Sequence, residues 1–255
     1  MLKNWGKIFK PWPIFLILLL ALCLRIYDIQ NNPKAMYGDS LTLVYDAYSI
    51  LKTGHDQTGQ FWPLFFSMGG GRPAGYIYAT IPFTALFGPT PLAARLVSVL
   101  SGVGIVLLLY LICSQILSRK IGLFTAFLAA ITPWELSLSR EAFETHFALF
   151  LGLMGLYFFN KSKNNNLLLL PSSLSFALSM QTYSTYALTV VLFVTILLAD
   201  RAFSFSKRAF FNWQTAAFLS LIILSFSFSV YTSLSRGVSD RVSKLLIFKS
   251  KSYKE

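Results

Sequence analysis

Long apolar runs, separated by short polar turns, repeat along most of the chain and predict membrane-spanning helices. Seven runs have about the length that a bilayer requires. They are Trp12–Tyr27, Leu96–Leu117, Ile121–Leu136, Thr145–Phe159, Leu167–Met180, a sixth that follows the link Gln181–Tyr186 and ends near Ala199, and Phe211–Thr232. The pattern predicts an all-α polytopic membrane protein with about seven transmembrane helices.

The segment Asp28–Arg95 is the only long stretch between apolar runs, and it is rich in aromatic residues. Within Leu41–Leu51 the apolar positions follow helical spacing, and Gly54 is placed to end the helix. A second apolar stretch, Tyr76–Phe87, contains Pro82 and is too short to span comfortably. We expect the first stretch to be an interfacial helix with the apolar side chains Leu41, Val44, Tyr45, Tyr48 and Leu51 on its membrane face, and the second to be another interfacial helix or a re-entrant one.

Composition agrees with a membrane protein. Of the 255 residues, 55% are hydrophobic and only 13% are charged, and the mean hydropathy is +0.60. The net charge of +12 would suggest a nucleic-acid partner in a soluble protein. In a membrane protein basic residues instead set orientation, so no nucleic-acid partner is predicted.

Seven spans divide the polar residues between two faces. One face collects Lys3, Lys7, Lys10, Arg119, Lys120, Lys161, Lys163, Arg201, Lys207 and Arg208, with Asp200 as its one acid. The other holds Arg25, Lys34, Lys52, Arg72, Arg95 and Arg140 together with Asp28, Asp39, Asp46, Asp56, Glu135, Glu141 and Glu144. The positive-inside bias makes the first face cytoplasmic. We therefore expect a multi-pass membrane protein with a cytoplasmic N-terminus and external acids.

Asp39 is the first candidate for chemistry. Gly38-Asp39-Ser40 precedes the amphipathic helix, and this pattern is typical of a helix N-cap. Position alone favours the cap over catalysis. The carboxylate can serve catalysis only if it faces a cleft.

Two other external segments carry candidate ligands. In Ser139–Glu144, Glu141 and Glu144 are three residues apart, which on a helix gives one shared face beside Arg140. An ion cluster, an anion site and a metal site all suit this pattern. Arg72 follows a glycine run, and a guanidinium binds phosphate through a planar fork of donors. The alternative is a flexible turn with an Arg that reaches the interface. His55 and His146 are expected to be structural.

Several of these blocks resemble one family. They are Gly38–Asp39, Asp46–Asp56, Phe61–Phe65, Arg72–Tyr78, Pro133–Trp134 and Ser139–Glu144. In order and spacing they are similar to bacterial membrane glycosyltransferases of the GT-C type, closest to the protein O-mannosyltransferase and lipid A aminoarabinose transferase relatives.

The resemblance implies that a sugar moves from a polyprenyl-phosphate carrier to a hydroxyl of a protein, lipid or glycan at the external face, with inversion. It implies Asp39 as the general base, Glu144 and then Glu141 as a second acid or metal contact, and Arg72 with Arg140 as phosphate ligands. Asp56, Tyr76 and Tyr78 are expected in the substrate loop. The resemblance leaves open whether a divalent cation binds as a cofactor near Asp39 and Glu144.

The chain departs from the family pattern in three places. Ser40 stands where an acid is common, Arg72-Pro73-Ala74 replaces Lys-Pro-Pro, and family members are longer. We expect residues 1–235 to form the transmembrane module and residues 236–255 to be a basic tail that begins a truncated external loop. A partner chain would then supply missing spans. The alternatives are a transporter or lipid flippase, and a non-catalytic remnant that binds carrier lipid.

Overall fold

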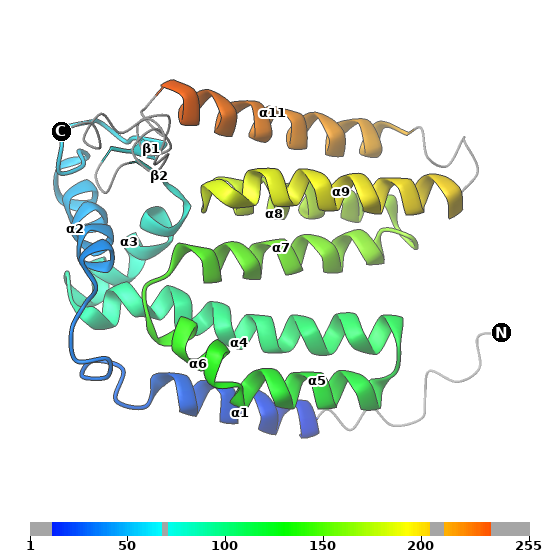
Figure 1. Ribbon diagram of the computed structural model, residues 1–255, viewed down its shortest axis with the longest axis horizontal. Helices are drawn as coiled ribbons and strands as arrows, with labels where there is room; N and C mark the ends of the chain where they lie inside the picture. The colour runs from blue at the N-terminus through cyan, green and yellow to red at the C-terminus, as the bar shows by residue number, and fades with distance from the viewer. Residues whose placement is uncertain (1–11, 68–70, 205–211, 236–255) are drawn as a thin grey trace, which may run out of the picture.

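The computed structural model describes residues 12–67, 71–204 and 212–235. In this part of the chain, seven long helices lie side by side, and their connections alternate between the two ends of the bundle (Figure 1). They are α1 (Trp12–Ile26), α4 (Pro91–Ile116), α5 (Arg119–Ile131), α7 (Glu144–Lys161), α8 (Leu169–Met180), α9 (Ser184–Ser204) and α11 (Trp213–Ser235). A 3₁₀ turn, Asn166–Leu168, precedes α8, and α6 (Pro133–Arg140) continues α5 after a bend of 58°.

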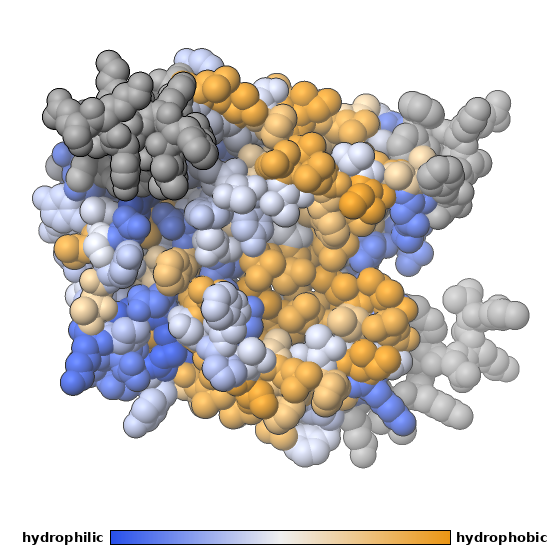
Figure 2. Space-filling view, viewed as in Figure 1, coloured by the Kyte–Doolittle hydropathy of each residue, from blue (hydrophilic) through white to orange (hydrophobic). Residues whose placement is uncertain are grey.

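Three of these helices are long and apolar enough to cross a membrane: Pro91–Ile116, Ser184–Ala202 and Trp213–Leu234. The bent pair α5–α6 is a fourth if it is one span. Figure 2 shows hydrophobic side chains over the middle of the bundle and hydrophilic ones toward its ends. The all-α membrane class is confirmed, whereas a total of seven spans stays a prediction. The N-terminal lysines, Lys207, Arg208 and the tail 236–255 lie outside the described residues.

The loop helices α2 (Gly38–Thr53) and α3 (Gly75–Phe87) lie together at one end of the bundle (Figure 1). As predicted, α2 ends at Gly54, whose positive φ of 74° suits glycine and whose N–H bonds to the Ile50 carbonyl. The face of α2 that packs on the protein is Leu43, Val44, Ala47 and Ile50. Of the face expected to meet the membrane, Leu41, Tyr45 and Leu51 point away from the protein, but Val44 belongs to the core.

A two-stranded hairpin joins α2 to α3 and was not predicted. Strand β1 (Phe65–Phe66) pairs antiparallel with β2 (Arg72–Pro73), so that Phe66 lies opposite Arg72. Phe66 is fully buried in the cluster that holds α2, α3 and α4 together. The hairpin therefore fixes the backbone of Arg72 against the packed part of the loop.

Helices α7 and α8 approach closely at Gly155. A Cβ at this position would lie 2.8 Å from two atoms of the Phe176 ring, whereas a Cβ at Gly152 would meet only the Ser179 hydroxyl, at 3.7 Å. Ser172 donates to the Gly155 carbonyl at 2.8 Å, which fixes the approach further. Small residues at such contacts let membrane helices pack backbone to backbone.

We predict that Gly155→Ala destabilises the protein by about 1–3 kcal/mol, the usual cost of overpacking. The matched variant Gly152→Ala should be neutral or stabilising, because alanine is the better helix former. Thermal unfolding in detergent, followed by circular dichroism, measures both. Equal unfolding temperatures for the two variants would show that the α7–α8 contact is not tight.

The start of the hairpin loop is held by two buried acids. Asp46 in α2 accepts a hydrogen bond from the Gln57 N–H at 3.1 Å, and Asp56 accepts from the N–H groups of Thr58 and Gln60, each at 2.9 Å. Burial raises the pKa of Asp46, and the negative charge of Asp56 raises it further. The folded state therefore binds a proton more tightly at Asp46 than the unfolded chain does.

Because the pKa is raised on folding, this acid lowers stability as the pH rises above the pKa of the unfolded carboxyl. Asp46→Asn keeps an acceptor for Gln57 and removes the charge. We predict that Asp46→Asn raises the unfolding temperature at pH 7 more than at pH 4. The control variant Asp28→Asn, at an exposed position, should leave the unfolding temperature unchanged at both pH values. An unchanged pH profile in the Asp46 variant would contradict this account.

Candidate active site

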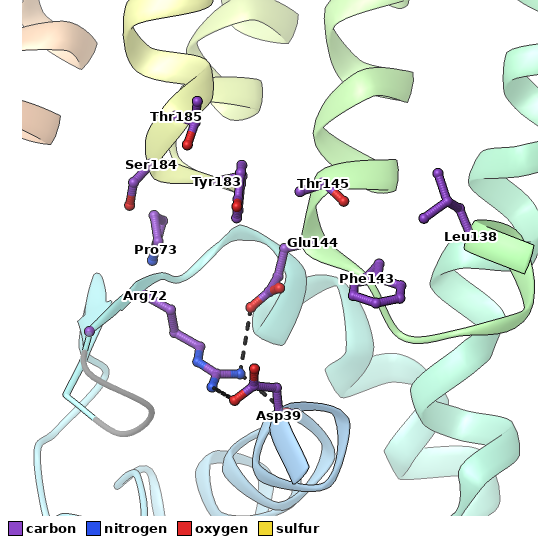
Figure 3. Close-up of a pocket in the computed structure, with 11 residues that line it drawn as sticks. Asp39, Arg72, Pro73, Leu138, Phe143, Glu144, Thr145, Tyr183, Ser184 and Thr185 are labelled. Carbon is purple, nitrogen blue, oxygen red and sulfur yellow. Dashed lines mark hydrogen bonds and ion pairs between the residues drawn. The ribbon is translucent and has the colours of Figure 1, made fainter. Parts of the chain in front are cut away.

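Arg72 lies between two carboxylates. Its Nη2 is 3.0 Å from Asp39 Oδ1 and its Nη1 is 3.5 Å from Glu144 Oε1 (Figure 3). Nη1 also donates to the backbone carbonyl of Asp39 at 3.2 Å. The Arg72 side chain is 9% exposed and that of Glu144 15%, but that of Asp39 is 63% exposed. The cluster is thus a shielded cation with one shielded and one accessible carboxylate.

Three separate elements bring these groups together: Asp39 in the first turn of α2, Arg72 in β2, and Glu144 at the start of α7. The expectation that Asp39 caps α2 is wrong. The helix begins at Gly38 with Tyr37 as its N-cap, and no side chain makes a capping bond. An acid in the first turn is still favoured by the helix dipole, and its carboxylate is directed to Arg72.

The cluster forms part of a pocket of about 380 Å³. Its lining residues are Asp39, Gly71, Arg72, Pro73, Leu138, Phe143, Glu144, Thr145, Tyr183, Ser184 and Thr185. Helices α2, α7 and α9 all begin beside it, and helix N-termini carry partial positive charge. Together with Arg72 they make the pocket suited to an anionic group.

A second hollow, an apolar groove of about 450 Å³, is lined in part by Ala74 and Gly75, which directly follow the pocket residues Arg72 and Pro73 in the chain. It is lined by Leu64, Ala74, Gly75, Tyr78, Ala177, Leu178, Gln181, Leu221, Leu224, Ser225 and Phe228. The contact between Gly75 and the turn after α8 adjoins both hollows: the Gly75 N–H donates to the Gln181 carbonyl at 2.9 Å, and a Cβ on Gly75 would overlap the Thr182 side chain. A charged pocket and an apolar groove thus share one short segment, Arg72–Gly75.

The pocket does not offer a good metal site. Asp39 and Glu144 both contact the Arg72 guanidinium, so a cation would have to displace a cation. In the described parts of the chain, no three His, Cys, Asp or Glu side chains gather at ligand distance. The residues present do not fit a divalent ion, and we derive no step through one.

Comparison with known proteins shows the family and the fold. Residues 72–235 match the family described as dolichyl-phosphate-mannose-protein mannosyltransferase. The chain belongs to this family. The match begins at Arg72 and includes Glu144, whereas Asp39 precedes it. None of the curated proteins matches the chain.

Among solved structures, ArnT from Cupriavidus metallidurans in the apo state is similar in fold. The TM-score is 0.61 at 13% sequence identity, over 89% of this chain and 42% of ArnT. The chain therefore spans less than half the length of that protein. The predicted GT-C resemblance is confirmed at the level of family and fold.

Arg140 and Glu141 do not line the pocket of this family member. The Arg140 guanidinium donates to the carbonyls of Leu24 at 2.8 Å and Asn32 at 2.9 Å, which ties α6 to the end of α1. Glu141 ends α6 and Glu144 begins α7, so the expected shared helical face is wrong: the chain breaks between them. Burial raises the pKa of Glu141, which the charge of Arg95 partly offsets.

The three predicted substrate-loop residues have structural contacts. Asp56 is 4% exposed and organises its own turn. Tyr76 is fully buried, and its hydroxyl contacts Ser98 Oγ and donates to the Ala94 carbonyl, both at 2.8 Å. Only Tyr78 borders a hollow: it lines the apolar groove, stacks on Trp62 at 5.8 Å and donates to the Pro63 carbonyl.

Sequence reasoning missed Thr145, Tyr183, Ser184 and Thr185, which complete the pocket. Residues 181–186 were interpreted as a link between spans. Five consecutive hydroxyl-bearing residues at the start of a helix, Thr182 to Tyr186, were a signal that could have been used. His146, expected to be structural, is buried against Ser139 at 3.1 Å and does not line the pocket.

We predict that Tyr76→Phe lowers stability by about 1 kcal/mol, since it removes a buried hydroxyl that makes two hydrogen bonds. Ser98 also accepts from the Phe143 N–H at 3.3 Å, so the loss loosens the approach to Glu144. The matched Tyr78→Phe, with a partly exposed hydroxyl, should cost less. Thermal unfolding compares them, and a larger loss in the Tyr78 variant would contradict the burial argument.

Proposed function

We propose that this chain takes a sugar from a polyprenyl-phosphate carrier and transfers it, with inversion, to an acceptor hydroxyl at the external membrane face. The observation that carries the proposal is that the Arg72 cluster and an apolar groove are lined by consecutive residues of one short segment, Arg72–Gly75. A carrier of this type has a long apolar tail joined to a phosphate. Segment Arg72–Gly75 borders one hollow for each part.

In this proposal the isoprenoid end nearest the phosphate lies in the groove, and the phosphate reaches Arg72. The guanidinium has two terminal nitrogens that can bind two phosphate oxygens at once. When the phosphate arrives, Nη2 exchanges its bond to Asp39 for a bond to phosphate. Glu144, which contacts Nη1, keeps the guanidinium in place during the exchange.

Release from Arg72 leaves the accessible Asp39 carboxylate free to act as the base. It takes the proton of the acceptor hydroxyl as the acceptor oxygen forms a bond to the anomeric carbon. The bond from that carbon to the phosphate oxygen breaks, and the electron pair leaves with polyprenyl phosphate. Arg72 and the converging helix N-termini stabilise the charge that develops on the phosphate.

The charge distribution supports an external site. The end of the bundle that holds α2, α3 and the pocket also holds seven of the eight acids in the described residues, all except Asp200, and the opposite end holds Arg119, Lys120, Lys161, Lys163 and Arg201. By the positive-inside bias the basic end is cytoplasmic. We propose a multi-pass protein of the bacterial plasma membrane with its N-terminus inside. The proposed acceptor is a hydroxyl of a protein, lipid or glycan.

A transporter is less well supported. Ion-coupled transporters hold ionisable groups near the bilayer midplane. Here the buried ionisable side chains near the pocket, Arg25, Glu135 and His146, lie in the last turn of α1 and the first turns of α6 and α7. They are therefore grouped at one end of the bundle.

The test is turnover of a polyprenyl-phosphate-sugar by the chain in proteoliposomes with an acceptor. We expect Asp39→Asn to lower the rate about 10²- to 10⁴-fold, the usual contribution of a positioned base. Asp200→Asn, at the opposite end of the bundle, should leave it unchanged. Near-normal transfer by the Asp39 variant would contradict the assignment. A chain that binds the carrier without turnover would be the carrier-binding remnant.

A further inference from the structure

Four hydroxyl-bearing residues line the pocket together with the charged cluster: Thr145, Tyr183, Ser184 and Thr185. Figure 3 shows Tyr183, Ser184 and Thr185 on the far side of the pocket from Asp39, with Arg72 and Glu144 between. We call these four residues the hydroxyl wall. They come from the first turn of α7, the turn after α8 and the first turn of α9.

The wall differs from its surroundings in hydrogen bonding. Nearby Ser175, Ser179, Thr182 and Thr189 each donate to a backbone carbonyl at 2.7–3.1 Å. This is the common arrangement in membrane helices, where an unpaired hydroxyl is costly. Within the described residues, the side-chain hydroxyls of the wall make no such bond. These four hydroxyls are only partly buried or exposed, and they are therefore available to a polar ligand in the pocket.

The chemistry of the wall selects among ligands. Hydroxyl groups both donate and accept hydrogen bonds, as sugar hydroxyls do. Tyr183 adds a half-buried ring, held edge-on against Tyr186 at 6.2 Å, which offers an apolar surface to a sugar ring. The wall bears no charge, since its side chains are two threonines, one serine and one tyrosine. A cationic amino sugar seated against it would therefore find no anion on the wall.

We propose that the hydroxyl wall binds the sugar of the donor, and that it selects a neutral sugar with free hydroxyls. This rests on the proposed function, in which the phosphate binds at Arg72. In the pocket, Arg72 would then bind the phosphate and Asp39 would act as the base. The hydroxyl wall would determine which sugar is accepted. A volume of about 380 Å³ lies at the small end of ligand pockets, which suits one sugar unit rather than an oligosaccharide.

The test measures affinity, which separates the sugar from the carrier. The purified chain in nanodiscs is titrated with polyprenyl phosphate, polyprenyl-phosphate-mannose and polyprenyl-phosphate-aminoarabinose. We expect the mannose donor to bind more tightly than the other two. Ser184→Ala combined with Thr185→Ala should weaken the mannose donor about tenfold, as expected for two lost hydrogen bonds, and leave the bare carrier unchanged.

Thr189→Ala is the matched control, because Thr189 lies one turn further along α9 and bonds to the Thr185 carbonyl at 3.1 Å. It should change none of the three affinities. If the double variant unfolds at a lower temperature than the native chain, the isosteric variant Thr185→Val is used in its place. We expect it to weaken the affinity for the mannose donor by a smaller factor.

The outcomes are distinct. If the folded Ser184→Ala, Thr185→Ala variant keeps the native ratio of affinities for the mannose donor and the bare carrier, the hydroxyl wall does not bind the sugar. If the native chain binds the aminoarabinose donor more tightly than the mannose donor, the proposed selectivity for a neutral sugar is wrong. Binding of the bare carrier without any preference for a sugar would also overturn the wall, but leave the proposed function intact. A chain that binds none of the three lipids would contradict the proposed function itself.

Discussion

A guanidinium that is 9% exposed needs anionic or carbonyl partners, and Arg72 takes three of them from two different helices. This requirement determines the end of the bundle where the pocket forms. Helix α2 must present Asp39, the hairpin must hold Arg72, and α7 must begin at Glu144. The break between α6 and α7 allows the last of these, because a continuous helix would have carried Glu144 elsewhere.

Other arginines stabilise the same end of the bundle through hydrogen bonds to backbone carbonyls, and they do not line the pocket. Arg95 donates to the carbonyls of Ile29, Pro33 and Ala35, and Arg25 donates to those of Ala129 and Ala130. Arg95 and Arg140 thus tie the beginning of the long loop to α4 and α6, and Arg25 ties α1 to α5. Within this frame a charged pocket can remain open beside an apolar groove, and the proposed carrier spans the two.

The bundle was largely predictable because a bilayer demands long apolar runs, and these stand out in sequence. The helix α2 and its end at Gly54 followed from periodicity and from the conformational freedom of glycine. The hairpin was not predictable, since two-residue strands carry no periodic signal. Asp39 was mistaken for a cap because the same residue pattern precedes helices that it does cap. Its pairing with Arg72, and the separation of Glu141 from Glu144, depend on tertiary packing that no local pattern encodes.

The central claim is that Arg72, held by Asp39 and Glu144, receives the phosphate of a polyprenyl carrier. The most direct measurement compares the affinity of the chain for polyprenyl phosphate and for the uncharged polyprenol, in the native sequence and in Arg72→Gln. The account predicts that the phosphate binds more tightly than the alcohol, and that Arg72→Gln removes this preference while affinity for the alcohol is retained. Equal affinities in the native chain, or a preference that survives in Arg72→Gln, would contradict it.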